Sequence, residues 1–265
     1  MQKRPYKEIP RNLPYVWTSD YGEDEYGIYA AFTYKDISQY FRWIGPGEFL
    51  MGSPGNEPER YADELQHKVI LTRGYWLADT ACTQALWEAI MGNNPSGFKG
   101  AKLPVEKVSW KDCREFMLRI NEQIPSLELR LPTEAEWEYA CRAGTTTPFS
   151  FGETITTNQV NYDGNYPYNK GPRGEYREKT VEVKSLPPNP WGLYEIHGNV
   201  FEWCQDWFTD YSKETAIDPQ GSETGSLHVL RGGRWYYSAR LTRSACRGRD
   251  GPDSRYTGFR LARGH

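Results

Sequence analysis

The feature that most restricts how this 265-residue chain can fold is the composition of residues 231–265. This segment holds nine arginines and no Lys, Glu, Gln, Met, Asn, Ile or Val, so it lacks the β-branched aliphatic residues that fill hydrophobic cores. Aromatic side chains such as Trp235, Tyr236, Tyr237 and Tyr256 lie among small residues instead. Rigid aromatic residues set among small, adaptable ones are typical of binding surfaces, although an ordinary Gly- and Arg-rich loop region could have the same composition.

The rest of the chain has enough apolar residues for a substantial core, in one large or two small domains. The net charge of −3 gives no general electrostatic basis for binding nucleic acid or an anionic membrane. No apolar run approaches a membrane span, and residues 1–16 lack the apolar stretch of a signal peptide. We therefore expect a cytoplasmic protein without membrane insertion, with surface display by another route left open. The five scattered cysteines argue against a disulfide framework.

Helix ends are marked by capping residues. Thr83 can cap a helix that Gly92 stops, and both Ser109 and Thr133 begin patterns that resemble capping boxes. These signals predict helices from Gln84 to Met91, from Ser109 to about Gln123, and from Thr133 through Cys141 to a stop at Gly144.

Strand patterns occupy the stretch between residues 40 and 80. Alternation and flanking turns predict strands at Phe41–Ile44, Phe49–Met51, His67–Thr72 and Tyr75–Leu77. Residues 1–37 are polar and Tyr-rich with an acidic turn at 21–25, and residues beyond about Thr145 indicate short strands and long loops. We predict one α+β domain over residues 38–265, with residues 1–37 as an N-terminal extension packed on it.

A series of motifs in fixed order carries a family resemblance. The motifs are Phe49–Ser53, Pro104–Trp110, Arg130–Ala140, Asn189–Tyr194, His197–Trp203, Arg231–Gly233 and Gly258–Arg260. Together they resemble the formylglycine-generating enzyme, or sulfatase-modifying factor, family from about Phe41 to Ala262. The resemblance implies that family's elaborated C-type lectin-like fold, with few helices and irregular β structure. The fold alone does not fix the function, because the same scaffold carries enzymes and binding proteins.

The resemblance does not extend to the family's catalytic cysteines. Oxidases of the family bind copper(I) through two cysteines spaced C-x4-C after the RGG motif, where this chain has Tyr237, Thr242 and one nearby thiol, Cys246. The four histidines are scattered without metal-ligand spacing, and we interpret His67 and His197 as structural or surface residues. We therefore expect no enzyme activity and no required cofactor. The alternative is an enzyme of the formylglycine-generating or non-haem iron oxidoreductase superfamily with an altered or lost active site.

The tail instead resembles the variable region of proteins diversified by retroelements, here residues 231–263. In those systems adenine-directed copying errors scatter codons of the AAC type, which cannot become codons for Lys, Glu, Gln, Met or Trp. Arg234 fits through a serine codon, and the other candidate positions are all reachable. The candidate ligand-binding, variable positions are Arg234, Tyr236, Tyr237, Ser238, Leu241, Cys246, Gly248, Asp250, Gly251, Ser254, Tyr256 and Thr257.

The positions between these would hold the backbone. We expect these frame residues to be Trp235, Ala239, Ala245, Phe259 and Leu261, together with Arg243 and Arg260. Tyr236, Tyr237 and Tyr256 are the candidate anchors for a protein or cell-surface ligand, because interface energy concentrates in Tyr, Trp and Arg. The alternative for each of these tyrosines is that it is partly buried and serves only in packing. Leu241 and Cys246 could face inward.

The family resemblance also implies structural calcium held by loop oxygens. One site would use Asn161, the Tyr162 carbonyl, Glu175 and the Arg177 carbonyl; the other would use Glu195, the Gly198 and Val200 carbonyls, and Glu202. The structural alternative is that Glu202 and Asn199 bond to the protein and stabilise a loop.

Three functions follow from these observations. The chain is a binding protein with a diversified C-terminal surface, an enzyme of the same fold, or a calcium-stabilised scaffold with a fixed interface in a larger assembly. A nucleic-acid role has little support, because packing explains much of the arginine pattern.

Overall fold

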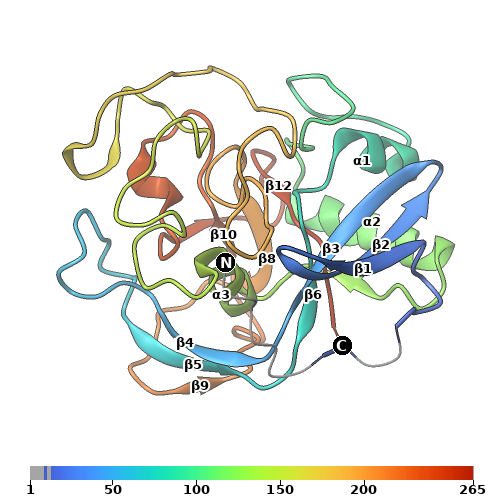
Figure 1. Cartoon of the computed structure of the whole chain (residues 1–265), viewed down its shortest axis with the longest axis horizontal. Coiled ribbons are helices and arrows are strands. Elements are labelled where there is room, and N and C mark those ends of the chain that lie inside the picture. Colours follow the sequence, from blue (N-terminus) through green and yellow to red (C-terminus); the bar gives the residue numbers. More distant parts are fainter. Residues whose placement is uncertain (1–8, 11–12, 265) are drawn as a thin grey trace.

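A six-stranded antiparallel sheet is the largest sheet in the described part of the computed structural model, which covers residues 9–10 and 13–264. Its order is β1-β2-β3-β6-β13-β7 (Figure 1). The strands are β1 (Asp20–Asp24), β2 (Gly27–Tyr34), β3 (Ile37–Ile44), β6 (Tyr75–Ala78), β13 (Ala262–Arg263) and β7 (Leu129–Arg130). The end of the tail thus lies between strands from the first half of the chain.

Two smaller sheets complete the β structure. One has the order β11-β10-β8-β12, in which β12 is parallel to β8, and the other has the order β4-β5-β9. Their strands are β4 (Gly47–Met51), β5 (His67–Leu71), β8 (Glu202–Trp207), β9 (Ala216–Ile217), β10 (His228–Arg231), β11 (Gly248–Asp250) and β12 (Gly258–Phe259).

The helices begin where the capping signals predict. Helix α1 (Gln84–Met91) starts after Thr83, and α2 (Trp110–Gln123) and α3 (Glu134–Arg142) begin with complete capping boxes. Helix α3 ends at Arg142, two residues before the predicted stop at Gly144, because Ala143 already adopts the left-handed conformation that ends the helix. Two short 3-10 helices, η1 (Tyr168–Lys170) and η2 (Ala239–Thr242), lie in loops.

Two core clusters hold the layers together. One joins β3 and β6 to α1 and α2, with Trp87 stacked on Phe116 at a ring distance of 5.5 Å. The other joins β5 and β6 to α3 and β10 around Trp137. The five cysteines are buried and unpaired, as expected for inert core thiols, including Cys82, Cys113, Cys141 and Cys204. Within the described part of the chain, no helix has both the length and the apolarity to cross a membrane.

Two expectations for the N-terminal segment need comment. The predicted acidic turn at residues 21–25 is wrong: residues 20–24 form strand β1, and the turn falls at residues 25–26, because β2 supplies hydrogen bonds that no local pattern reveals. Strands β1 and β2 also extend the main sheet through β3, so residues 20–34 are integral to the sheet. Residues 1–8 and 11–12 of the expected extension lie outside the described residues.

Candidate ligand-binding surface

The tail leaves the second sheet through a double-glycine turn. Gly232 and Gly233 follow β10 with φ angles of 93° and 75°, which glycine adopts without strain. A Cβ on Gly233 would lie 2.7 Å from the carbonyl oxygen of Leu241, so the turn also packs directly against η2. Only glycine fits this close approach, and the turn fixes where residues 234–242 begin.

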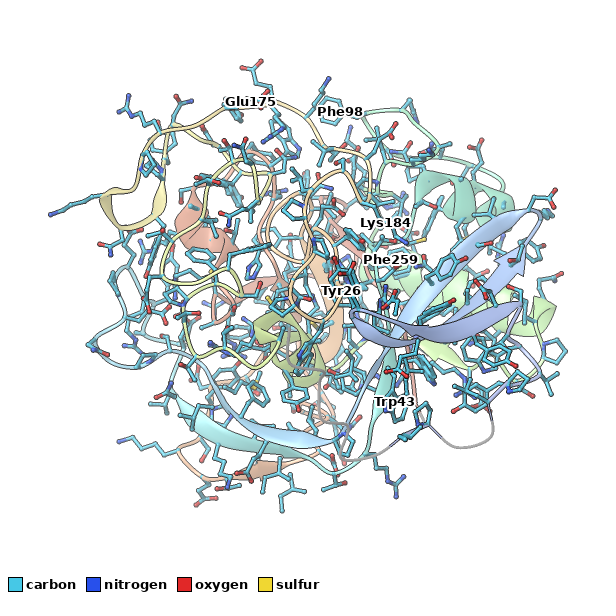
Figure 2. All side chains as sticks on the ribbon, viewed as in Figure 1. Tyr26, Trp43, Phe98, Glu175, Lys184 and Phe259 are labelled. Atoms are coloured by element: carbon cyan, nitrogen blue, oxygen red, sulfur yellow. The ribbon has the colours of Figure 1, made fainter. Side chains whose placement is uncertain are left out.

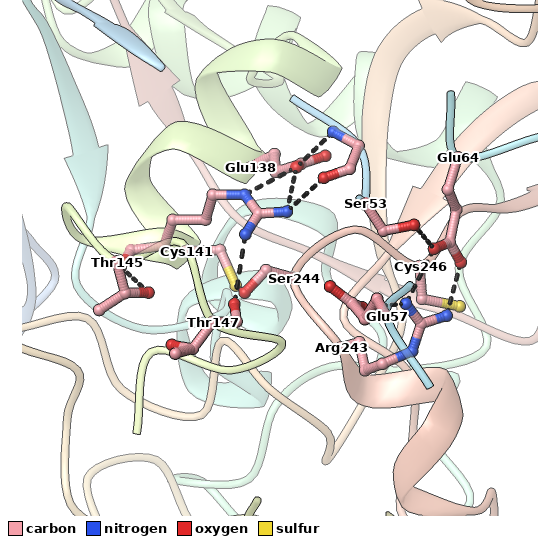
Figure 3. A network of polar contacts seen from close by, with 12 residues as sticks. Ser53, Glu57, Glu64, Glu138, Cys141, Thr145, Thr147, Arg243, Ser244 and Cys246 are labelled. Carbon is pink, nitrogen blue, oxygen red and sulfur yellow. Dashed lines mark hydrogen bonds and ion pairs between the residues drawn. The ribbon is translucent and has the colours of Figure 1, made fainter. Parts of the chain in front are cut away.

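A buried guanidinium ties η2 to the acidic loop of residues 54–66. Arg243 is fully buried, and its guanidinium contacts Glu57 at 2.5 Å and Glu64 at 2.6 Å. Figure 3 shows Arg243 beside both carboxylates, with the Ser53 hydroxyl donating to Glu64 at 2.7 Å. Because both acids are inside the protein, each needs this partner to remain charged. Arg243 is confirmed as a frame residue.

Other buried arginines fasten the rest of the tail to α3 and β8. Arg231 pairs with Glu138, and Arg247 contacts Glu134 at 2.8 Å. Arg260 pairs with Glu202 at 2.8 Å and is also confirmed as a frame residue. The backbone N–H of Gly52 donates to Glu138, and the next residue bonds to Glu64, so the two networks meet at residues 52–53. The small frame residues Ala239 and Ala245, like Phe259 and Leu261, are fully buried.

Arg234 organises the exposed side chains of the tail. Its guanidinium lies 4.2 Å from the ring centre of Tyr236 and 4.4 Å from that of Tyr237, and it donates to the Tyr237 hydroxyl at 2.6 Å. It also donates to the Tyr256 carbonyl at 3.2 Å, which joins two segments 22 residues apart in the chain. Cation–π contacts of this kind favour a defined arrangement of the rings. We call Arg234, Trp235, Tyr236, Tyr237 and Tyr256 the aromatic cluster.

The anchors differ in exposure. Tyr256 is 66% exposed and Tyr236 is 37% exposed. Tyr237 is partly buried against Phe201 of the first core cluster, so for this residue packing accompanies display. A pocket of about 380 Å³ opens beside the cluster, and its lining includes Trp235, Tyr236 and Tyr256.

A second group of candidate positions lies around β11 and the loop after it. Asp250 accepts from the backbone N–H of Gly251 at 2.8 Å and from the hydroxyl of Ser254 at 2.6 Å. Phe201 links this group to the aromatic cluster, because a Cβ on Gly248 would lie 3.4 Å from its ring. Arg234 and Tyr237 contact the same ring. The structure thus brings the two groups together around Phe201.

Four candidate positions lie elsewhere or inside. Ser238 and Leu241 are half-buried at η2. Cys246 and Thr257 are only 1% and 2% exposed, so their assignment to the displayed surface is wrong. The backbone N–H of Cys246 bonds to the Arg243 carbonyl, and Thr257 forms a bridge with Val108, and these contacts turn both side chains inward. Codon reachability carries no information about burial.

Trp235 combines the two roles that the sequence separates. Expected as a frame residue, it is half-buried, stacks near Tyr176 at 6.0 Å, and meets the edge of Phe98 at 5.6 Å. It also lines the pocket. The sequence did not single out Phe98 or Tyr176. Both belong to irregular loops without periodicity, so no local pattern predicts that they contact the tail.

The second expected calcium set fits poorly. The Glu202 carboxylate accepts from the Trp137 indole at 2.7 Å and carries the Arg260 ion pair, and Glu195 accepts from the backbone N–H groups of Lys184 and Leu186. Burial raises the pKa of Glu195 to about 7. Protein donors thus already use both carboxylates.

The first set fits better at one position. The side-chain oxygen of Asn161 is buried and has no hydrogen-bond partner among the described residues. This is the environment expected of an oxygen that ligates a cation. Glu175 is exposed and lies 3.2 Å from Arg177. Calcium at Asn161, with Glu175 and the Tyr162 and Arg177 carbonyls, stays a prediction. No cluster of three or more His, Cys, Asp or Glu side chains suited to a metal occurs in the described residues.

His197 has a structural environment. It is buried, its Nδ1 lies 2.7 Å from the Thr242 carbonyl, and its Nε2 lies 2.9 Å from the Ser150 hydroxyl. Burial lowers its pKa to about 4, so the ring is neutral at physiological pH. Its contact with Thr242 makes it another support beneath η2.

Comparisons with known proteins agree with this architecture. The model of the sulfatase-modifying factor enzyme 1-like domain matches residues 34–265. The formylglycine-generating enzyme of Mus musculus is 34% identical over 212 residues, which cover 75% of the chain and 54% of the enzyme. That of Streptomyces coelicolor is 39% identical over 173 residues, which cover 60% of the chain and 52% of the enzyme. The chain therefore spans about half the length of these relatives.

One solved structure matches this chain over nearly the whole of its own length, unlike the two enzymes. Treponema denticola variable protein 1 superposes with a TM-score of 0.76 at 31% identity, covering 89% of this chain and 99% of that protein. The expected C-type lectin-like, formylglycine-generating-enzyme-type fold is confirmed, with its few helices and irregular β structure.

Proposed function

The chain belongs to the sulfatase-modifying factor enzyme 1-like family, and from this premise we propose that it is a non-enzymatic binding protein. Its binding surface is the aromatic cluster with the neighbouring positions around β11. The ligand is a protein or a cell-surface structure, and a retroelement diversifies the tail that contacts it. The structural similarity to a variable protein supports this choice.

One observation carries the proposal: exposed aromatic side chains are mounted on a backbone that buried ion pairs fix. Tyr236 and Tyr256 face solvent, whereas Arg231, Arg243 and Arg260 are completely buried beside carboxylates. A backbone ordered before binding loses less entropy when a ligand binds. Exchange of the exposed side chains would leave these internal pairs unchanged.

Sequencing the gene from several isolates tests the proposal. We expect substitutions at exposed or half-buried candidate positions such as Tyr236, Gly251, Ser254 and Tyr256. The codons of Arg243, Phe259 and Arg260 should stay constant. A tail that is identical among isolates whose remaining sequence has diverged would contradict diversification.

The enzyme alternative rests on the formylglycine-generating relatives. It is tested by incubating the purified protein, with and without copper(I), with a sulfatase-derived cysteine peptide and measuring formylglycine by mass spectrometry. Our proposal expects no turnover. Product formation that depends on the protein would overturn the non-enzymatic assignment, whatever the tail does among isolates.

A further inference from the structure

The pocket beside the aromatic cluster continues into a second, larger one. The first has about 380 Å³ and the second about 600 Å³, and Phe98 and Thr180 line both. We call the two together the composite groove. Figure 2 shows Phe98, which lines both pockets, and Glu175, from a different loop, at the upper edge of the molecule. The groove therefore extends from the tail across loops that other parts of the chain form.

We propose that the composite groove binds an extended acidic segment of a protein partner, with an apolar side chain of that segment held at the aromatic end. The proposal rests on the proposed binding function and specifies its ligand chemistry. At the aromatic end, Trp235, Tyr236 and Tyr256 supply large apolar surface. Pockets lined by such rings are the usual anchors of interface energy.

The other end of the groove is basic. Lys99, Arg177 and Lys179 line it, and Lys107 and Arg234 line the adjoining pocket. Two acidic residues of the lining, Glu106 and Glu182, oppose these five, and Glu106 is already engaged by the backbone N–H of Phe98 at 3.3 Å. Outside the lining, Glu175 pairs with Arg177 at 3.2 Å, so four of the five positive side chains have no ion pair with a carboxylate among the described contacts. The whole chain has a net charge of −3, so this excess of positive charge is local. A negatively charged ligand complements it.

Two polar groups along the groove lack partners. Thr180 is 2% exposed and lies where the two pockets meet, and its hydroxyl has no hydrogen-bond partner in the described part of the chain. Among the same residues, Nη1 of Arg177 is also buried and unpaired. Unsatisfied buried donors are costly, and a carboxylate or carbonyl of a bound segment would satisfy them.

The arrangement of the rings favours a peptide over single-stranded nucleic acid. Trp235 and Tyr236 meet at 68°, and Phe98 meets Trp235 at 80°. Tyr176 lies over Trp235 at 23° and covers part of one face. Bases need free, successive ring faces on which to stack, which this edge-to-face packing does not provide. Side chains of a peptide can fill the spaces between such rings.

Fluorescence anisotropy with the full chain tests the proposal. The probe is a short fluorescein-labelled peptide with one phenylalanine followed by a run of aspartates and glutamates. Control probes replace the acids with asparagine and glutamine, or the phenylalanine with serine, and labelled oligothymidine serves as the nucleic acid. We expect saturable binding of the acidic peptide that weakens as salt increases, and about tenfold weaker binding of either control peptide.

Protein variants locate the site. Lys179→Glu should weaken binding of the acidic peptide about tenfold, and Tyr256→Ala should weaken it to a similar extent while leaving the salt dependence unchanged. Lys213→Glu is the matched control, because Lys213 is also exposed but does not line the groove. Its affinity should equal that of the unmodified chain. Thermal unfolding confirms that each variant is folded.

Three results would overturn the inference: no saturable binding, equal affinity for acidic and neutral peptides, or tighter binding of oligothymidine. Equal loss in Lys179→Glu and Lys213→Glu would also overturn it, because the effect would then be one of net charge. None of these results bears on variation among isolates. A varying tail with no acidic-peptide binding would reject the groove and leave the proposed function intact.

Discussion

Two glycines of the tail differ in how closely other atoms surround them, and therefore in how well each position would accept a larger side chain. A Cβ on Gly251 would meet no atom within 4 Å, whereas one on Gly248 would lie 3.1 Å from the Cβ of Leu230. Gly248 is therefore restricted by the neighbouring strand, although glycine is one of the residues that an AAC-type codon can reach. The exposed loop should accept more kinds of side chain than the strand before it.

Substitution by tyrosine at each position tests this difference. We expect Gly251→Tyr to change the free energy of unfolding by no more than about 0.5 kcal/mol. Gly248→Tyr should lower it by about 1–3 kcal/mol, because Leu230 and Phe201 must move. Chemical denaturation measures both values. Equal losses would show that the local packing at Gly248 does not limit its side chain.

A buried carboxyl group should make stability depend on pH. Burial raises the pKa of Asp206 to about 8 from its ordinary 3.8, and nearby Glu134 adds to the shift. The folded protein then keeps a proton that the unfolded chain loses, so the free energy of unfolding falls as pH rises from about 4 to about 8. Glu195, with a pKa of about 7, acts in the same direction.

The upper part of the pH range shows the effect of these carboxyl groups best. His197 and His228, whose pKa values burial lowers to about 4 from 6.5, oppose the trend most strongly between about pH 4 and 6.5, and their contribution fades as the pH rises further. We expect Asp206→Asn to reduce the decline in unfolding free energy between pH 6.5 and 8, measured by denaturation at each pH. An unchanged slope would mean that Asp206 is ionised in the folded protein.

At the scale of elements, the ion pairs between Arg243, directly after η2, and the acidic loop of residues 54–66 fix the backbone that carries the exposed side chains of the tail. Arg243 follows η2 directly and holds two carboxylates, so the pair of segments should fold or separate together. By contrast, Arg255 forms an exposed pair with Asp112 at 3.2 Å. The two arginines lie in the same tail but contribute to stability through different environments.

Replacement of each arginine by methionine separates these contributions. Arg243→Met leaves Glu57 and Glu64 buried without their partner and should cost about 3–5 kcal/mol of unfolding free energy. Arg255→Met should cost less than about 1 kcal/mol, because exposed ion pairs contribute little. Thermal and chemical denaturation compare them. Similar small losses would show that the buried network does not hold the tail.

Local signals predict the elements unevenly. The helices followed from Thr83, Ser109 and Thr133, because a cap needs only its own turn of backbone. Strand β1 did not, since its pairing depends on β2 and an acidic sequence alone suggests a turn. The loops from residue 145 to 201 position Tyr176 and Thr180 through contacts distant in sequence, which no local pattern contains.

The candidate surface was predictable in composition and less so in position. The exposed Tyr236 and Tyr256 and the buried Arg243 and Arg260 lie as the sequence indicated. Cys246 was misplaced because residue type and codon do not determine which way a side chain turns. The groove beyond Thr180 was not predicted, because it arises only when residues 98–103 and 177–186, which are distant in sequence, meet.

For the whole molecule, a bound calcium ion would affect most strongly the loops beyond residue 145. The unpaired oxygen of Asn161 lies where loops around residues 161, 179 and 199 join through hydrogen bonds. Millimolar calcium should raise the unfolding temperature relative to the chelator-treated protein, since binding to the folded state alone stabilises it. Asn161→Ala should remove that increase. An unmodified chain whose unfolding temperature ignores calcium would contradict this prediction.

Strand β13 lies between β6 and β7, and its residues are synthesised after every exposed side chain of the tail. A premature stop codon or a shifted reading frame anywhere in the tail before β13 would therefore remove this central strand, even where the surface residues before the error are intact. Such a chain would expose unpaired strand edges and be open to degradation. If the tail is diversified as proposed, only complete, in-frame versions would fold and reach a partner.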